Sequence, residues 1–351
     1  METGTLEQSL PGLEADVPRV EMTTGHAIPL TPKKRLMVFA GRSHPELAAK
    51  ITQQLGVELG EIELTTFANG ETYCRYCESI RGADVFVVQT GCRPVDQNIM
   101  EVLFMIQAAR LASAKRITAV IPWFPYSRQD RKAKPREPIS SRLLADMIQT
   151  SGADRLLTMD LHAGQIQGFF TIPVDHMTAL PLFAQYFRDL GLTGDRVVSV
   201  APDAGRAKHA VRFAEMIDAD FAIMNKTRPS RDVASVTEIT GRVAGKIAIV
   251  GDDNISTGHT LLDGARALTE AGAEQVWVFA THGLFATDAL ERFAKADLAG
   301  IVVTDTVPVD PILRPKNMTV LTVSGLLAET IMNVFADESV SAIFGGENQL
   351  F

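Results

Sequence analysis

Two adjacent carboxylates, Asp252 and Asp253, stand between an apolar run and a loop of small, hydroxylated and glycine residues, within IAIVGDDNISTGHT. Carboxylates accept hydrogen bonds from vicinal hydroxyls and can reach a hydrated magnesium ion. Free N–H groups where a loop enters a helix bind anions. The segment therefore predicts a site for ribose 5-phosphate, with the sugar at the acids and its phosphate at the loop. An acidic turn that only caps the helix would explain this segment alone equally well.

The loop supplies hydroxyl donors and a permissive backbone beside the acid pair. Ser256, Thr257 and Thr260 can donate to a phosphate, and Gly258 lets the backbone approach it closely. Ligands of open α/β sheets bind outside the carboxyl ends of the strands. We therefore expect both acids to end a strand at that edge.

Four further side chains are placed where metal or phosphate chemistry is possible. His162 and Asp203 each end a strand-like run, although a structural hydrogen bond or a helix cap would also explain them. Lys226 and Arg228 are two positions apart in NKTRP, and on an extended segment this spacing directs both cations the same way. A solvated basic turn is the simpler explanation of that pair.

Two loops of the first half carry an aromatic surface and basic groups. The residues of the loop FANGE that could face a ligand are Phe67, Asn69, Gly70 and Glu71. Its Asn-Gly pair is typical of a hairpin turn. The loop YSRQDRKAKPREP is basic and flanked by proline, and it contains Arg128 and Gln129. A plain turn and a solvated segment explain both loops without a ligand.

The elements that must position these residues alternate as βαβ units from Lys34 onward. Strands are expected in RLMVFAG, ADVFVVQTG, RITAVIPWF, DRLLTMDLH, RVVSVAPD, DFAIMNKTR, GKIAIVGDD, QVWVFATHG and GIVVTDTVP. Amphipathic helices are expected in VDQNIMEVLFMIQAARLAS and HTLLDGARALTEAG. Continuous β-branched runs suit parallel strands that are covered on both faces.

The order of elements around VFVVQTGCRPVDQN in the first half is repeated around IAIVGDDNISTGHT in the second. We therefore predict an α/β protein with two similar, doubly wound, mostly parallel-sheet domains. Their predicted bounds are residues 34–180 and 181–351, after a flexible extension of residues 1–33.

The composition of the chain limits the classes of protein to which it can belong. The chain has 351 residues, of which 46% are apolar and 22% charged, as in globular proteins. Its net charge of −8 argues against binding to nucleic acid or to an anionic membrane. No apolar run is long enough to span a membrane, and the first 33 residues lack the core of a secretory signal. Cys74, Cys77 and Cys92 are too few for a disulfide framework, so reduced thiols and a cytoplasmic location are expected.

The phosphate loop and the wider chain resemble ribose-phosphate pyrophosphokinase (PRPP synthetase), which has the type I phosphoribosyltransferase-like fold. The segments that carry the resemblance are, in order, TTFANGETYCRYCESIRGADVFVVQ, RITAVIPWFPYSRQDRK, LTMDLHAGQIQGFF, APDAG, NKTRP, FATHGLF and LTVSGLLAETI. SRQDRK together with DLHAGQIQGFF is highly specific, whereas the strand–acid–loop segment alone is not.

The resemblance implies transfer of the β,γ-diphosphoryl group of ATP to the C1 hydroxyl of ribose 5-phosphate, giving PRPP and AMP. It implies Mg²⁺ held by His162 and Asp203, with Lys226 and Arg228 as catalytic cations. The implied ATP-binding residues are Phe67, Asn69, Gly70, Glu71, Arg128 and Gln129. The implied ribose 5-phosphate-binding residues are Arg228, Asp252, Asp253, Ser256, Thr257, Gly258, His259 and Thr260. It further implies a homo-oligomer, a hexamer, in which ATP sites are shared between subunits, with the first domain on the ATP side and the second on the sugar side.

Four positions depart from the family pattern. Ser256 replaces an acid, His259 a glycine and Gly251 an aliphatic residue, and Thr227 stands where many members have a basic residue. If position 259 needs a positive φ, the histidine is strained by about 1–3 kcal/mol. It could instead add a donor to the phosphate. Gly251 is expected to loosen the end of its strand.

Two other functions are compatible with parts of the sequence. A phosphoribosyltransferase that consumes PRPP and a base shares the sugar site but leaves SRQDRK, FANGE and NKTRP unexplained. A regulatory homologue would keep the fold and associate with active subunits. The altered phosphate loop favours this third hypothesis, whereas the matching His162, Asp203, Lys226 and Arg228 argue against it.

Overall fold

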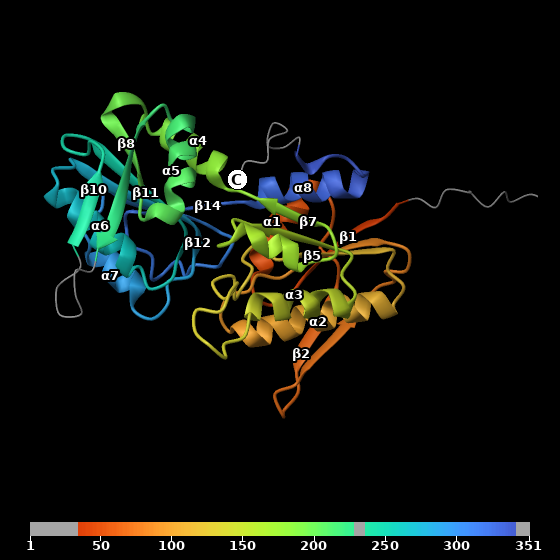
Figure 1. Ribbon diagram of the computed structural model, residues 1–351. Coiled ribbons are helices and arrows are strands. Elements are labelled where there is room, and N and C mark those ends of the chain that lie inside the picture. The colour runs from red at the N-terminus through yellow and green to blue at the C-terminus, as the bar shows by residue number, and fades with distance from the viewer. Residues whose placement is uncertain (1–33, 228–235, 342–351) are drawn as a thin grey trace, which may run out of the picture. The chain divides into compact units, whose positions relative to one another are not determined.

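The computed structural model describes residues 34–227 and 236–341, and two mostly parallel sheets form their framework (Figure 1). No helix in these two stretches is both long and apolar enough to cross a membrane. Arg228 lies outside the described residues, as do the predicted N-terminal extension and the last ten residues of the chain.

The first sheet has five parallel strands in the spatial order β1-β4-β5-β6-β7. They are β1 (Leu36–Ala40), β4 (Asp84–Val88), β5 (Arg116–Val120), β6 (Arg155–Met159) and β7 (Val174–Met177). The helices on its faces are α1 (Pro45–Leu55), α2 (Val95–Leu111), α3 (Ser140–Ser151) and α8 (Ser324–Ala336). Val85 and Val87 pack with α2 and α3, whereas Phe86 and Val88 belong to the cluster of α1 and α8. Alternate side chains of one strand are thus buried on both faces, which explains its continuous apolar run.

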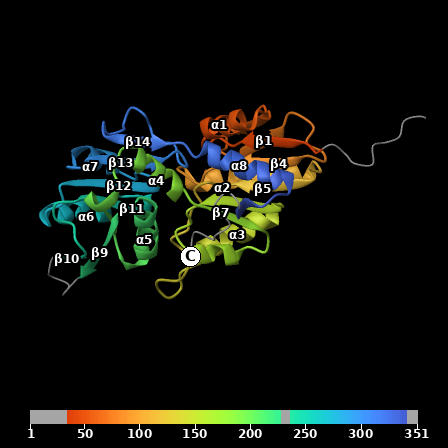
Figure 2. The ribbon, with the colours of Figure 1, turned by 90° about the horizontal axis from the view of Figure 1, so that it is seen from above.

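The second sheet has seven strands in the order β10-β9-β8-β11-β12-β13-β14. They are β8 (Val197–Ala201), β9 (Asp220–Thr227), β10 (Val236–Thr240), β11 (Ile247–Ile255), β12 (Gln275–Gly283), β13 (Gly300–Thr304) and β14 (Met318–Leu321). All neighbours are parallel except β10, which is antiparallel to β9. Helices α4 (Leu180–Asp189) and α5 (Ala207–Met216) cover one face, and α6 (His259–Glu270) and α7 (Ala289–Lys295) cover the other (Figure 2). The α/β class with mostly parallel sheets is confirmed.

The strand order of the second sheet reverses between β8 and β11. The chain proceeds outward through β9 and β10 on one side and through β12, β13 and β14 on the other. The carboxyl ends of β8 and β11 therefore flank the topological switch point, where open α/β sheets bind ligands. The first sheet shows no such reversal among its described strands, because its order runs in one direction.

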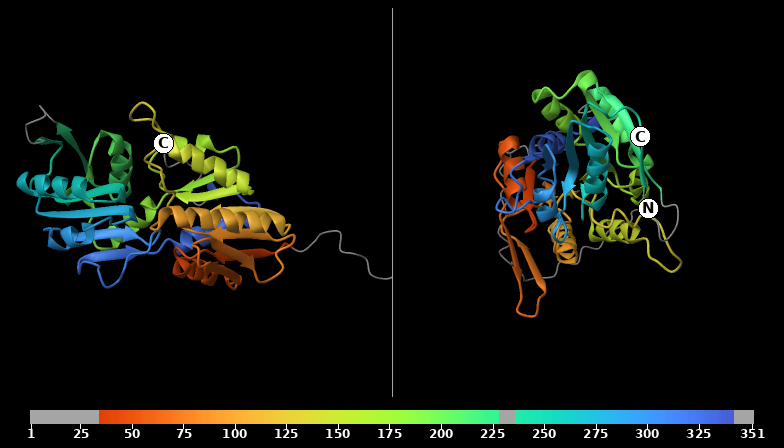
Figure 3. Two further views of the ribbon diagram at one scale, coloured as in Figure 1. Left: turned by 90° about the horizontal axis from the view of Figure 1, so that it is seen from below. Right: turned by 90° about the vertical axis from the view of Figure 1, so that its left-hand side faces the viewer.

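A small antiparallel hairpin and three short 3₁₀ turns complete the described structure. The hairpin strands are β2 (Ile62–Thr66) and β3 (Thr72–Tyr76), and the turns are Gly164–Phe169, Gly194–Arg196 and Ala204–Arg206. The hairpin projects from the five-stranded sheet and its helices (Figure 3). Cys74, Cys77 and Cys92 are all free, and burial raises the pKa of Cys74 and of Cys92 to about 11. The thiols of Cys74 and Cys92 are therefore poor nucleophiles.

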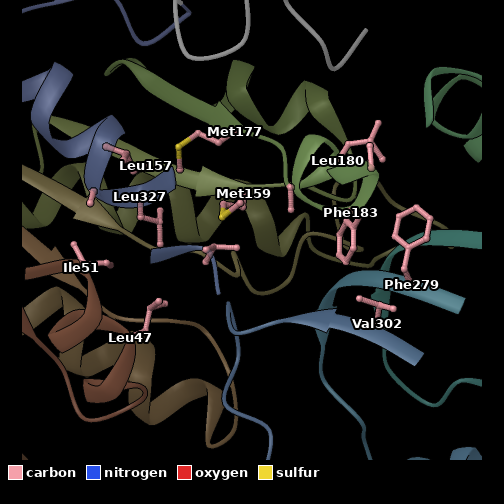
Figure 4. Close-up of a cluster of buried hydrophobic side chains, with 14 of the residues drawn as sticks. Leu47, Ile51, Leu157, Met159, Met177, Leu180, Phe183, Phe279, Val302 and Leu327 are labelled. Atoms are coloured by element: carbon pink, nitrogen blue, oxygen red, sulfur yellow. The ribbon is translucent and has the colours of Figure 1, made fainter. Parts of the chain in front are cut away.

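One apolar cluster runs from α1 and α8 to α4, α5 and β12 (Figure 4). The predicted domain boundary at residue 180 stays a prediction. The two sheets lie on either side of this residue in sequence, but α8, which follows the second sheet, packs against α1 of the first domain. Phe183 and Phe279 lie side by side in this cluster, with ring centroids 4.6 Å apart.

Gly251 makes room for Phe279 on the neighbouring strand. A Cβ atom at position 251 would lie 2.2 Å from Phe279 Cζ, which no side chain can accept without displacing the ring. Strand β11 nevertheless continues through this glycine to Ile255. The expected loosening of the strand end is therefore wrong: the glycine lets an aromatic ring pack against the strand.

Replacing Gly251 with Val should lower the free energy of unfolding by about 1–3 kcal/mol, because overpacking forces Phe279 out of its place. Combining Gly251→Val with Phe279→Leu should recover part of that loss. Urea unfolding followed by far-UV circular dichroism measures both. Gly325→Ala in α8 is the control, because nothing lies within 4 Å of a Cβ atom there. Equal stability of Gly251→Val and the natural protein would contradict the packing argument.

Candidate functional site

The acid pair lies within β11 and not after it. Asn254 and Ile255 still pair with His282 and Gly283 of β12, so the strand runs two residues beyond the acids. The expectation that the acids end the strand is thus wrong by two residues, because the parallel ladder with β12 extends that far. Both acids still lie near the carboxyl end of β11, at the switch point of the sheet.

The two acids differ in accessibility. The side chain of Asp252 is 18% exposed, whereas Asp253 is buried. Asp253 Oδ2 accepts a hydrogen bond from Asn254 Nδ2 and lies 2.8 Å from His162 Nδ1. The structure thus brings His162 and the acid pair together. Asp252 is the acid that a ligand in solution can reach.

Arg206 is the central cation of this site, and the sequence analysis missed it. Its Nε lies 3.1 Å from Asp252 Oδ1, its Nη2 forms an ion pair with Asp253 Oδ1, and Nη2 is 3.2 Å from His162 Nδ1. Its backbone N–H donates to Asp203 Oδ1 over 3.2 Å. No motif marks this residue; its position three residues after Asp203 was the only signal.

The pKa values of the two acids are shifted in opposite directions. Burial and the charge of Asp253 raise the pKa of Asp252 to about 8. Burial alone would also raise the pKa of Asp253, but its hydrogen bond with His162 and the charge of Arg206 outweigh burial and lower it. At neutral pH Asp253 is therefore the permanent anion, and it is balanced by Arg206.

The phosphate loop has its positive φ at Gly258 and not at His259. Gly258 has φ 76° and precedes α6, which begins at His259. A Cβ atom at Gly258 would also lie 2.3 Å from Phe293 Cε2. His259 is an ordinary first residue of the helix, so the condition for its strain is not met. Backbone N–H groups of this turn stay available for an anion.

Arg292 of α7 adds a cation to the loop that the sequence analysis did not find. Its Nη2 donates to the Thr257 carbonyl over 2.7 Å, and its Nη1 lies 2.6 Å from His259 Nε2. Since a guanidinium can only donate, His259 accepts this hydrogen bond. His259 therefore holds Arg292 at the loop, and a hydrogen bond from His259 to the phosphate stays a prediction.

A cavity of about 800 Å³ opens beside the acid pair, a size that suits a nucleotide. His162, Arg206 and Asp253 line it, together with the basic residues Arg131, Lys208 and Arg212. These cations from the loop after β5 and from α5 match the charge of a polyphosphate. The cavity is the place in the described chain where a nucleotide can approach the acids.

The predicted ATP-binding residues divide into two places. Arg128 Nη2 donates to Asn254 Oδ1 over 2.8 Å, so it lies one residue from the acid pair. Gln129 instead holds Ser140 and Ser141 at the start of α3.

The turn of the β2–β3 hairpin does not line the cavity. Phe67 is half exposed and rests edge-on against Tyr73, with ring centroids 5.6 Å apart. Gly70 has φ 92°, and the Glu71 N–H bonds to Asn69 Oδ1. The expected turn is present, and the structure does not bring its residues to the acids.

The predicted catalytic cations cannot be compared with this geometry. Lys226 lies in β9 in register with Thr237 of β10, and its side chain is outside the description, as is all of Arg228. The remaining loop residues Ser256 and Thr260 lie at the two ends of the turn around Gly258.

Comparisons with known proteins agree along the chain. The family described as the N-terminal domain of ribose phosphate pyrophosphokinase matches residues 36–152, and the phosphoribosyl synthetase-associated domain matches residues 224–345. A ribose-phosphate pyrophosphokinase of Fusobacterium nucleatum is 45% identical over 88% of this chain and 97% of its own. One from Caldanaerobacter subterraneus is 47% identical over 88% and 98%. The crystal structure of phosphoribosylpyrophosphate synthetase from Mycobacterium smegmatis matches with a TM-score of 0.81 and 42% identity, over 86% of this chain and 99% of that one.

Replacing Arg292 with Ala should weaken binding of ribose 5-phosphate, the ligand expected from the sequence, by about 10–100-fold, because charge-assisted hydrogen bonds contribute about 1.5–3 kcal/mol. Isothermal titration calorimetry measures the affinity. Lys295→Ala on the same helix is the control, because its side chain is largely exposed and pairs only with Glu291. Unchanged affinity of Arg292→Ala would mean that the loop holds its shape without this cation.

Proposed function

This chain belongs to the ribose-phosphate pyrophosphokinase family, and we propose that it makes PRPP and AMP from ATP and ribose 5-phosphate. The observation that carries the proposal is the meeting of an acid pair, an amide-lined turn and His162 at the switch point of the second sheet. The enzyme is a transferase of the diphosphokinase type. No membrane or nucleic-acid partner enters this reaction, and a cytoplasmic location is part of the proposal.

The turn around Gly258 holds the 5-phosphate of the sugar. The backbone N–H groups and the hydroxyls of Ser256, Thr257 and Thr260 donate to its oxygens, while Arg292 keeps the turn in place. Asp252 accepts from a ribose hydroxyl, since it is the accessible acid. The sugar is then fixed at both ends, which leaves its C1 hydroxyl oriented toward the cavity.

The reaction forms a bond between the C1 oxygen and the β-phosphorus, and it breaks the bond between that phosphorus and the oxygen that AMP retains. Such a transfer needs positioning and charge neutralisation and no covalent nucleophile. Lys226 and Arg228 are proposed to stabilise the charge on the transferred group. Loss of a preorganised partner of this kind typically costs about 10²–10³-fold in rate.

His162 and Asp203 are proposed to hold the Mg²⁺ that accompanies ATP. The metal, when bound, supplies positive charge to the phosphates. No three histidine, cysteine or acidic groups of the described residues gather as a metal site, so phosphate oxygens and water must complete the coordination. The Nδ1 contact of His162 with Asp253 leaves Nε2 for a ligand, which is the usual arrangement of a metal-binding histidine.

ATP is proposed to occupy this cavity, which Asp130 and Arg131, the residues that follow Arg128 and Gln129 in sequence, line. The β2–β3 hairpin, whose turn contains Phe67, Asn69 and Glu71, projects from the sheet (Figure 3), so these residues would serve a nucleotide bound to a neighbouring subunit. This arrangement requires a homo-oligomer, for which we propose the hexamer implied by the resemblance.

Purified protein should release AMP from MgATP and ribose 5-phosphate without any added base, as measured by chromatography of the nucleotides. Asp252→Asn should lower kcat/KM for ribose 5-phosphate by about 10–100-fold, because the amide leaves one acceptor oxygen where the carboxyl group has two. Glu291→Gln on the exposed face of α7 is the matched control and should retain activity.

Three outcomes distinguish the alternatives. Pyrophosphate release that depends on a nucleobase would make the protein a phosphoribosyltransferase. Absence of AMP, together with stimulation of an active relative in a mixed assembly, would make it a regulatory homologue. Equal activity of Asp252→Asn and the natural protein would remove the acid pair from the sugar site.

A further inference from the structure

Arg206 contacts one carboxylate oxygen of each acid at the centre of the site. Its guanidinium is 17% exposed and contacts Asp252 Oδ1, Asp253 Oδ1 and His162 Nδ1. Asp253 Oδ2 is engaged by His162 and Asn254, and Asp252 Oδ1 also accepts from the Asp253 N–H. A metal ion that bridges the two acids would compete with the arginine for Asp252 Oδ1 and Asp253 Oδ1.

The backbone keeps Arg206 in this place. Residue 206 ends the turn Ala204–Arg206 and is the N-cap of α5, and its N–H group bonds to both the carbonyl and the side chain of Asp203. The side chain therefore starts from an anchored position between β8 and β11. The arginine is part of the framework of the site and not a mobile surface group.

A guanidinium suits this position for chemical reasons. It stays charged at every physiological pH, and its planar set of donors can address two carboxylates at once. A second cation on the same oxygens would be repelled at short range, in a place where little water screens the charges. Two cations therefore compete for one place.

We propose that Arg206 is the built-in cation of the sugar site, where its guanidinium takes the place that a divalent metal ion would otherwise have at Asp252 and Asp253. The inference rests on the proposed function only in assigning these acids to ribose 5-phosphate. The free protein then holds no metal at the acid pair. Arg206 positions the acids so that Asp252 faces the sugar, and it limits which cations enter the site.

Mn²⁺ binding to the full chain, without nucleotide or sugar, tests this inference. Electron paramagnetic resonance measures free Mn²⁺ during the titration. The natural protein should bind Mn²⁺ with a dissociation constant above about 1 mM. Arg206→Met, which keeps the bulk of the side chain, should gain one site per chain that is at least about tenfold tighter, because the competing charge is gone. Adding Asp252→Asn to Arg206→Met should remove that site, whereas Arg206→Lys should not gain it.

Other outcomes overturn the inference. A tight Mn²⁺ site in the natural protein that Asp252→Asn abolishes would show that metal binds the acids beside the arginine. A folded Arg206→Met variant that gains no site would show that the arginine does not compete with metal. If Arg206→Met does not fold, as judged by circular dichroism, the natural protein and Asp252→Asn decide by themselves. The titration contains no substrate, so its result is independent of whether the protein forms AMP.

Discussion

The buried carboxylate of Asp253 cannot stay ionised within a strand unless positive charge is buried with it, because removing an anion from water costs several kcal/mol. The parallel order of β8 and β11 meets this requirement. It places the turn after β8, and therefore Arg206, directly against Asp252 and Asp253. The geometry of the sheet thus makes the acid pair possible, and the site follows from the sheet.

The same strand is supported from behind by an aromatic core. Phe183 and Phe213 both contact Phe279 on the face of the second sheet that α4 and α5 cover. Gly251 lets Phe279 lie flush against β11 one residue before the acids. A substitution in this aromatic core therefore also displaces the acid pair, because close-packed interiors transmit small displacements.

Much of the fold could be predicted because its central strands are continuous apolar runs. The expected run QVWVFATHG is β12, and the expected helices at VDQNIMEVLFMIQAARLAS and HTLLDGARALTEAG are α2 and α6. The strands β7, β10 and β14 were not predicted from the sequence, because these short segments carry polar or partly exposed residues. The family and its reaction followed from motifs with specific spacing.

Residues of the candidate site could be predicted only where a chemically suitable side chain stands in a recognisable local motif. The acid pair, Gly258 and His162 each stand in a recognisable local pattern. Arg206 and Arg292 act through neighbours that are distant in sequence: Arg292 reaches Thr257 across 35 positions, and Arg206 reaches His162 across 44. Nothing in a local window marks such residues, because their partners are set by the pairing of strands and helices.

The packing of α8 against α1 joins the last described helix to the first. One face of the N-terminal sheet is therefore covered only by α1 until α8 has left the ribosome. Although its five strands come early, this sheet is expected to mature late, and the nascent chain must keep an apolar surface away from other chains during synthesis. Contacts between sequence-distant segments of this kind also slow folding.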